Sequence, residues 1–563
     1  MAASPEVRLK RFLHYGSELP VYNASRGLLT FTDKSCPSIP TLIEAGKDKE
    51  VGLQIVKAHS DGYAVRREAL LYAMAICALN KKSDTLREMI YNGVKTVCAK
   101  AEDLFLFFVY LQELNNNKLN SGKGLRRLIS DWYLKRDVME FAEIVSKKRG
   151  YFHWSHVDLM KIAHIKTDDP AKQVVIAYAF KNGNNIKELK EKYKGVKEAA
   201  PVLQYLKVAS EVRYSKDPKT VSRAIEANSL SLGHLPQHTK EILYSEEVWC
   251  SLLTGMPLEE MLDNLQYVSR HQMLRAVPRG QSKLLTRRYC DALGNTKTLA
   301  ESNVHPARIL IERSTYQLIA KEKIGLAAKL KHSAVVRKPP PPNEEIIEEL
   351  GKLMDSAFKL LVPTGQRYVV GLDARILMFA RRCWKNRYVN CADAAALLAL
   401  SLVRCEREVT VGLYGGSQAP FKPVQLGTNE SLDSLLAKMK AYQTDDASIL
   451  AAMLAGGAAA AGAETGGAKV PLASQMLEWA ETEGVVADVF VAIGESQLTT
   501  VNLNCQINKY RNAVNAPNAK LVHVHLNGPA KVADKSRGNG LLAIHGFDKN
   551  VPRVIEAFAR GAF

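Results

Sequence analysis

Apolar residues recur at helical spacing through most of the first 335 positions. The clearest case is the segment 85–98, in which apolar residues three or four positions apart share one helix face: Leu86, Met89, Ile90, Val94 and Val97. The run 70–79 is almost entirely apolar, which is typical of a buried helix. The same reasoning predicts further helices over five ranges: 101–114, 124–134, 138–146, 157–165 and 171–179. No segment between 38 and 335 alternates as a half-buried strand would, so we predict a mainly α domain.

Many short amphipathic helices in series, without a fixed repeat length, are typical of a HEAT-like or armadillo-like α-solenoid. The alternative is a helical domain of irregular topology. A solenoid can curve until its ends meet, so the first interpretation also predicts an extended surface and, on closure, a central hole.

The pattern changes near residue 366, where short apolar runs begin to alternate with helices. Strands are predicted over five ranges: 367–372, 408–414, 486–493, 521–526 and 541–545. Helices are predicted between or after them, at 392–405, 431–442 and 551–559. Strands separated by helices predict an α/β doubly wound sheet, in which ligands bind at the carboxyl ends of the strands.

Residues 336–343 contain four consecutive prolines, which lack N–H donors and favour extended backbone, so this segment predicts a stiff linker. We therefore expect three parts: a helical domain at 1–335, the linker with a connecting helix at 336–366, and the α/β domain at 367–563. The Ala/Gly-rich run 451–468 predicts a flexible surface insertion. No G-x-G-x-x-G follows a predicted strand, which argues against a dinucleotide-binding enzyme.

The net charge is concentrated in the helical part. Lys and Arg number 77 and Asp and Glu number 58, which gives +19 overall. Residues 1–335 hold 52 basic and 36 acidic residues, a net charge of +16, whereas residues 336–563 hold 25 and 22, a net charge of +3. Because a basic surface attracts polyanions, we expect any polyanion site in the first part.

Composition and cysteine spacing exclude several classes. No apolar run reaches the roughly 18–20 residues that a membrane helix needs, and no secretory signal core is visible, so we expect no membrane partner. The nine cysteines include no C-x-x-C pair, which excludes zinc ribbons and thioredoxin motifs. Their odd number indicates reduced thiols in a cytoplasmic protein, with the nucleus as a second location.

Basic, imidazole and aromatic side chains interleave in the segment 121–166. Lys and Arg pair with phosphates, and aromatic or imidazole rings stack on unpaired bases, so this segment predicts RNA contacts. The candidates are Arg126, Arg127, Lys147, Lys148, Arg149, His156, Lys161 and His164. For its aromatic residues we favour the alternative that they anchor the core: Trp132, Tyr133 and Trp154. A metal held by its histidines is not expected, because no cysteine is near and His156 and His164 lie about two helical turns apart.

Short pieces in collinear order along nearly the whole chain carry a family resemblance. They are the segments 10–18, 42–46, 67–77, 125–133, 154–156, 163–166, 247–249, 256–258, 264–265, 305–306 and 309–311. Together they resemble the TROVE module of the Ro 60-kDa autoantigen family, and residues 358–367 resemble the start of that family's second domain.

The resemblance implies a ring of helical repeats that binds small structured RNAs, the Y RNAs, on its outer surface. It also implies that single-stranded ends of misfolded non-coding RNAs enter the hole. Two RNA-contact positions of the family fall on Lys147 and His164. A third, basic in the family, falls on Tyr151, and Arg149 two residues away is its candidate substitute.

The topology and the resemblance both indicate a von Willebrand factor A domain in the second part. Such domains usually hold Mg²⁺ through D-x-S-x-S after the first strand, because a small cation needs hard oxygen ligands. Asp373 remains here, but Arg375 and Leu377 replace the two serines. Thr444 matches the second loop, and Glu495 stands in the third where Thr-Asp is expected. We therefore predict no functional metal and no cofactor, with Arg375 paired to Asp373 or Glu495.

The leading hypothesis is a non-catalytic RNA-binding protein that acts within a ribonucleoprotein in RNA stability or quality control. Its partners would be small non-coding RNA and proteins bound by the α/β domain. The alternative is a protein-interaction scaffold that uses the α/β domain and binds RNA weakly or not at all. An enzyme ranks third, because the sequence shows no H-E-x-x-H, no P-loop and no nucleophile–base pair.

Overall fold

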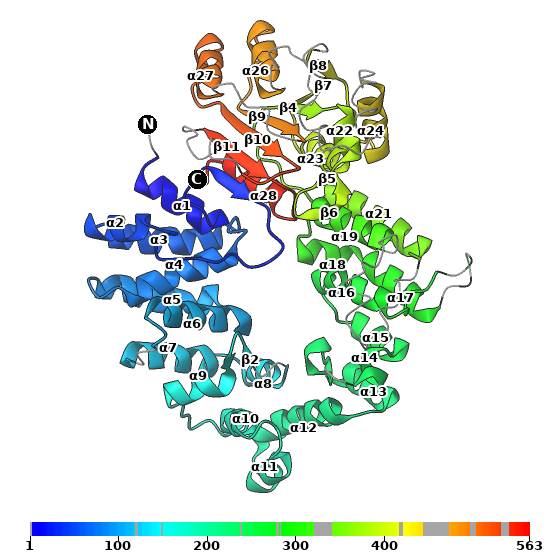
Figure 1. The fold of residues 1–563 in the computed structure, drawn as a ribbon. Helices are drawn as coiled ribbons and strands as arrows, with labels where there is room; N and C mark the ends of the chain where they lie inside the picture. Colours follow the sequence, from blue (N-terminus) through cyan, green and yellow to red (C-terminus); the bar gives the residue numbers. More distant parts are fainter. Residues whose placement is uncertain are drawn as a thin grey trace, which may run out of the picture.

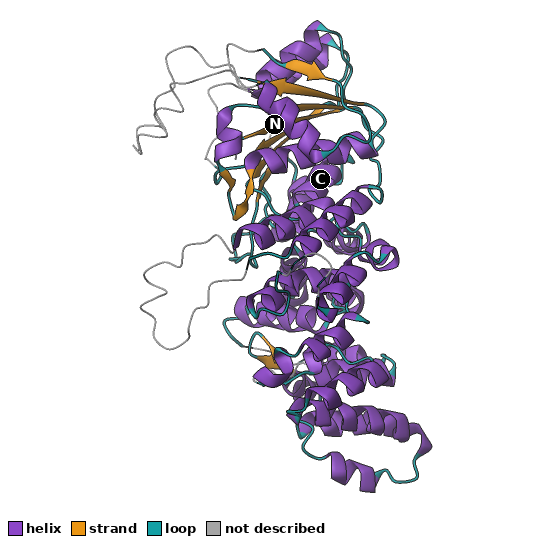
Figure 2. Cartoon of the chain, turned by 90° about the vertical axis from the view of Figure 1, so that its right-hand side faces the viewer, coloured by secondary structure: helices purple, strands orange, loops and turns teal. Residues whose placement is uncertain are grey.

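The computed structural model describes residues 3–118, 122–147, 150–236, 239–276, 278, 281, 283–319, 341–415, 420–442, 472–495, 503–530 and 540–563. Lys148, Arg149, Thr444, the Ala/Gly-rich run and most of the proline linker lie outside these residues. The described chain forms a curved array of helices whose two ends meet at an α/β domain (Figure 1). Seen from the side, the helices form a narrow stack below the sheet (Figure 2). The predicted mainly α helical array and the predicted α/β domain are therefore both confirmed.

The first arm of the array consists of two layers. One layer is a succession of neighbouring helices: α3 (Asp48–Ser60), α5 (Asp84–Val97), α7 (Lys123–Leu134) and α9 (His156–Ala163). The other layer consists of α1 (Pro5–Tyr15), α4 (Arg67–Leu79) and α6 (Ala101–Leu114). The short helix α2 (Ser38–Glu44) packs beside α1. The almost wholly apolar sequences of α4 and α6 follow from this packing, because most of their side chains are buried.

The array then turns and returns along a second arm. The turn is formed by α8 (Val138–Lys147), α10 (Pro170–Phe180), α11 (Ile186–Lys192) and α12 (Ala200–Tyr214). The second arm contains α13 (Pro218–Asn228), α14 (Lys240–Leu243), α15 (Glu246–Leu253), α16 (Leu258–Arg270), α17 (Leu284–Leu293), α18 (Thr296–Ser302) and α19 (Pro306–Ile319). After the proline linker, α21 (Glu344–Phe358) packs on α17 and α19, so this connecting helix completes the second arm.

One predicted absence is wrong. The short strands β2 (Gly150–Tyr151) and β3 (Trp154–Ser155) form an antiparallel hairpin inside the helical part. Phe152 and His153 make its turn, both with positive φ. Two-residue strands are too short to show alternation, which is why the hydrophobic pattern did not reveal them.

The α/β domain contains a seven-stranded sheet in the order β1-β11-β10-β9-β4-β7-β8. Its strands are β4 (Tyr368–Asp373), β7 (Val409–Tyr414), β8 (Lys422–Val424), β9 (Val489–Gly494), β10 (Lys520–His525) and β11 (Leu541–His545), with β1 described below. Only β8 is antiparallel to its neighbour. A small hairpin, β5 (Arg382–Cys383) and β6 (Asn386–Asn390), stands beside the sheet.

Helices cover both faces of the sheet, which explains its continuous apolar strands. They are α22 (Ile376–Ala380), α23 (Cys391–Cys405), α24 (Leu432–Ala441), α26 (Leu472–Thr482), α27 (Leu503–Ala513) and α28 (Val551–Ala559). Val369 and Phe490 pack with α26 and α27, whereas Val370 and Val491 belong to the core that contains α23. Within the described residues, no helix is both long and apolar enough to cross a membrane.

The N-terminal segment closes the ring. After α1 the chain forms β1 (Val21–Asn23), which pairs in parallel with β11 at the edge of the sheet. The C-terminal Phe563 packs on His14 and Tyr15 of α1, with ring centroids 5.3 and 5.0 Å apart. The two ends of the chain thus lie side by side (Figure 1).

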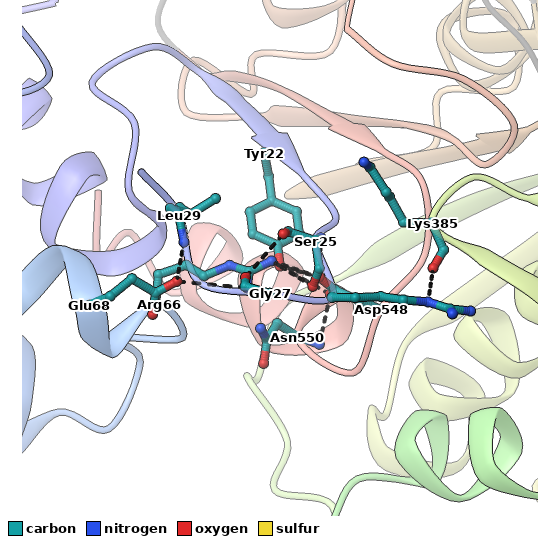
Figure 3. A network of polar contacts seen from close by, with 10 residues as sticks. Tyr22, Ser25, Gly27, Leu29, Arg66, Glu68, Lys385, Asp548 and Asn550 are labelled. Atoms are coloured by element: carbon teal, nitrogen blue, oxygen red, sulfur yellow. Dashed lines mark hydrogen bonds and ion pairs between the residues drawn. The ribbon is translucent and has the colours of Figure 1, made fainter. Parts of the chain in front are cut away.

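A buried polar group, here called the closing network, consists of Tyr22, Ser25, Arg66 and Asp548 (Figure 3). Arg66 Nη2 lies 2.9 Å from Asp548 Oδ2, and the two side chains are only 7% and 11% exposed. The Tyr22 hydroxyl donates to the same carboxylate at 2.7 Å, and the Ser25 N–H donates at 3.0 Å. One aspartate of the α/β domain therefore binds three groups of the first arm.

Candidate nucleic-acid interface

Lys147 is the last residue of α8, which lies on the inner side of the curve (Figure 1). Its ammonium pairs with Glu143 one turn earlier, and its side chain is 35% exposed. From α12, Arg213 donates to the carbonyl of Ser146. Two basic side chains from different helices thus gather at one helix C-terminus, where the helix dipole favours positive charge.

The 3₁₀ turn η2 (Leu232–His234) packs closely against this helix end. A Cβ on Gly233 would lie 3.3 Å from the Cβ of Lys147, so glycine permits the close approach. Burial, and then the charge of Lys147, lower the pKa of His234 to about 4. The imidazole is therefore neutral near pH 7, with Nδ1 accepting from the Ser231 N–H and Nε2 3.1 Å from the Tyr205 hydroxyl.

The charge of Lys147 also acts on the facing arm. Burial raises the pKa of the Glu260 carboxyl on α16, and the charges of Lys147 and Lys100 oppose that rise. Basic side chains of the first arm and an acidic side chain of the second are thus electrostatically coupled across the inside of the ring.

The β2–β3 hairpin follows α8 directly and carries partly exposed rings. Tyr151 and Phe152 contact each other edge to face, with centroids 4.1 Å apart. His153 is exposed at the turn, while Trp154 is partly buried against Phe108. Tyr151 is therefore partly exposed beside the α8 terminus.

The aromatic residues of α7 belong to the core, as predicted. Trp132 and Tyr133 are 2% and 0% exposed. The indole N–H of Trp132 donates to the Cys98 carbonyl at 2.7 Å, which satisfies its one polar group.

His156 also lies in the core, which corrects its place among the surface candidates. It is the first residue of α9 and is only 2% exposed. Its Nδ1 is 2.8 Å from the Tyr133 hydroxyl, and its ring packs on Phe105 with centroids 5.0 Å apart. An imidazole enclosed in this way cannot stack on a base or reach a phosphate.

The other candidates occupy the layer that contains α7 and α9. Lys161 and His164 are exposed at the end of α9, where His164 takes the left-handed conformation that stops the helix. On α7, Arg127 is exposed and Arg126 is half-buried. The structure therefore separates the candidates into an α7–α9 surface and the inner α8 terminus, which sequence order could not distinguish.

Arg127 lines a groove of about 380 Å³ between α5 and α7. Lys95 and Lys135, also in its lining, both pair with Asp131, at 2.6 and 3.0 Å. The internal acid neutralises part of this positive charge. This groove could not be predicted from the sequence, because its two walls come from helices about forty residues apart.

The altered metal motif does not fit Mg²⁺. Arg375 Nε and Nη2 bind the two oxygens of Asp373 at 2.9 and 2.7 Å, and Asp373 is 1% exposed. Arg381 pairs with Glu495, which is equally buried. Guanidinium groups thus occupy both carboxylates that a cation would need. Among the described residues, no group of three or more His, Cys, Asp or Glu side chains has a geometry suited to a metal.

These features define a class of protein: a helical ring closed by a von Willebrand factor A-like domain with an altered metal motif. A family model described as the Ro60 vWA domain matches residues 461–559. The RNA-binding protein RO60 of Caenorhabditis elegans is 22% identical over 99% of this chain and 88% of its own length. The RNA-binding protein RO60 of Deinococcus radiodurans is 23% identical over 99% and 93%.

A solved structure agrees along the whole chain. The crystal structure of the Deinococcus radiodurans Ro (Rsr) protein matches with a TM-score of 0.77 and 21% identity, covering 100% of both chains. The chain is thus similar, over nearly its whole length, to proteins of the Ro60 family.

Proposed function

We propose that this chain binds RNA through its helical ring, as a non-catalytic subunit of a ribonucleoprotein. The observation that carries the proposal is the inner α8 terminus, where Lys147 and Arg213 gather beside a hairpin with partly exposed rings. The net charge of +16 on residues 1–335 supports it, since phosphate contacts dominate affinity for nucleic acid. The names of the two relatives, each an RNA-binding protein, support it further.

The two groups of basic residues suggest two kinds of contact. The α7–α9 surface presents Arg127, Lys161 and His164 to a small structured RNA of the Y-RNA type. The inner α8 terminus receives the single-stranded end of a misfolded RNA, with phosphates at Lys147 and bases near the hairpin rings. Binding both kinds of RNA would serve RNA stability or quality control in the cytoplasm or nucleus.

The test compares two charge reversals at lysines that each pair with a glutamate four residues away. Lys147→Glu removes the inner contact, and Lys297→Glu on α18 is the control, because Lys297 also pairs with a glutamate four residues away. Affinity for a hairpin RNA with a single-stranded tail is measured by fluorescence anisotropy over a salt series. Lys147→Glu should weaken binding at least tenfold and lower the salt slope by about 1, whereas the control should change little.

A second pair of measurements separates the two surfaces. Lys161→Glu should weaken binding of a structured RNA without a tail, and Lys147→Glu should affect that RNA less. Equal affinity of wild type and Lys147→Glu for the tailed RNA would refute the inner site. Absence of RNA binding at every salt concentration would favour the protein-interaction scaffold.

A further inference from the structure

A cavity of about 350 Å³ lies at the seam between the second arm and the α/β domain, and we call it the seam pocket. Its walls come from α16, α19, the β5–β6 hairpin and the loops that follow β1 and β11. These segments are far apart in the sequence, so the seam pocket exists only when the ring is closed. Pockets of this size at domain interfaces are the usual sites of small ligands.

Two amide side chains in its wall have polar atoms that no described residue satisfies. Asn386 is 3% exposed, and its Oδ1 is buried without a hydrogen-bond partner. On α16, both Oε1 and Nε2 of Gln266 are likewise buried without a hydrogen-bond partner. Since an unsatisfied buried polar atom costs about 1–3 kcal/mol, these two amides indicate a ligand that offers both donors and acceptors.

The acidic side chains that line the seam pocket are paired within the protein, whereas three of its basic side chains have no ion-pair partner in the part of the chain that the structure describes. Arg308 in the wall pairs with Asp263 and, at 2.9 Å, with Glu312, so the acidic residues of this wall share an internal partner. Asp548, a third acid in the lining, is held by Arg66. The carboxylates of the wall are therefore engaged within the protein.

Arg26, Lys385 and Lys549 are the exposed cations in the lining, and none has a carboxylate within ion-pair distance among the described residues. Arg26 Nε donates to the Lys385 carbonyl at 2.5 Å, which fixes the β1 loop on the β5–β6 hairpin. Burial raises the pKa of Glu312, and the charges of Arg308, Arg26 and Lys549 oppose this, so both loops direct positive charge toward the cavity wall.

We propose that the seam pocket binds one nucleoside monophosphate unit. The amides of Gln266 and Asn386 pair with the edge of the base, and Arg26, Lys385 and Lys549 hold the phosphate. Asn and Gln side chains pair with the N6 and N7 positions of adenine, so adenine is the preferred base. An inorganic anion alone would leave the two amides unsatisfied.

The unit can come from a free nucleotide or from the terminal residue of an RNA strand. With RNA as its source, the inference rests on the proposed function. With a free nucleotide it does not, because the seam pocket and the α8 terminus share no residue. Lys147→Glu therefore distinguishes the two proposals: it should weaken capture of RNA ends at least tenfold and leave binding of AMP unchanged.

The test is calorimetric titration of the full-length protein with AMP, adenosine and inorganic phosphate. AMP should bind more tightly than either fragment and should raise Tm, since a ligand that binds only the folded state stabilises it. Gln266→Met should weaken AMP at least tenfold without lowering Tm, because it removes an unsatisfied buried amide. Lys549→Ala should weaken AMP about fivefold and leave adenosine unchanged, while Lys297→Ala is the control.

Three results would overturn the proposal: no binding of AMP at millimolar concentration, equal affinity for phosphate and AMP, or unchanged AMP affinity in Gln266→Met. Competition then identifies the source. If AMP displaces an RNA tail that ends in adenosine 5′-phosphate, the terminal residue occupies the seam pocket. If the tail binds and AMP does not displace it, the pocket takes the free nucleotide.

Discussion

Replacing Asp548 by Asn should open the ring at its seam. The substitution keeps the shape of the side chain but removes the charge that Arg66 meets at 2.9 Å, where both side chains are about nine-tenths buried. Tyr22 and Ser25 also donate to this carboxylate, at 2.7 and 3.0 Å. Breaking one partner of a buried ion pair costs about 3–5 kcal/mol, because the other charge stays buried. Since Asn retains one acceptor oxygen, we expect about 3 kcal/mol.

Hydrogen exchange is the suitable assay, because a chain with two domains has no single two-state free energy of unfolding. The informative amides are those that join the first arm to β11, such as Ala24, which donates to the His545 carbonyl at 2.8 Å, and Ala543, which donates to Pro20 at 3.0 Å. A loss of about 3 kcal/mol should accelerate their exchange roughly a hundredfold, since each 1.4 kcal/mol is a factor of ten.

The control is Asp84→Asn, which breaks the pair with Arg87 on α5. Asp84 is 87% exposed, so exchange at the seam should stay within a factor of two of wild type. The combined replacement of Arg66 by Met and Asp548 by Leu should recover part of the protection, because neither charge of this pair is left buried alone, although Glu68 loses its contact with Arg66 at 3.9 Å. Exchange of Ala24 and Ala543 within threefold of wild type in Asp548→Asn would refute the role of the closing network.

Three further predictions concern the metal motif, pH and His156. Wild-type Tm should not change between Mg²⁺ and EDTA, whereas Arg375→Ser, which frees Asp373, should gain a Tm increase with Mg²⁺; a shift in wild type would contradict the ion-pair interpretation. Burial lowers the pKa of His234 from 6.5 to about 4, so its contribution to stability is complete above pH 6.5 and is lost as pH falls toward 4. Up to about 3 kcal/mol is involved, and His234→Gln should flatten the decline of Tm over that range; an unchanged slope would refute this. His156→Gln should lower Tm, because it disturbs the bond to Tyr133, but leave RNA affinity within twofold; a larger loss of affinity would show that the buried ring reaches RNA.

Most of the secondary structure was predictable, because hydrophobic periodicity is a local property. The helices α4 to α10 and the parallel strands β4, β7, β9, β10 and β11 occur where the pattern predicted them, within a few residues. The pair between Asp373 and Arg375 was one of two predicted alternatives, and it was accessible because the partners are two residues apart. Glu495 instead pairs with Arg381, which the sequence did not indicate.

The candidate interface was only partly predictable. Basic residues of the segment 121–166 are mostly at the surface, but composition does not say which side of a helix faces the core. His156 is therefore buried, and Lys147 lies in a different layer from Arg127 and His164. The hairpin at residues 150–155 was missed, since its strands have two residues each.

Local spacing of apolar residues was thus enough to predict helices, strands and fold class, and the positions of the charged residues revealed the charge asymmetry of the two parts. Closure of the ring was decided by tertiary structure, because β1 has three residues and pairs with a strand more than five hundred positions away. The same holds for the bond between Arg66 and Asp548 and for the seam pocket. Contacts over such separations depend on how the whole array curves, and no local pattern in the chain records that curvature.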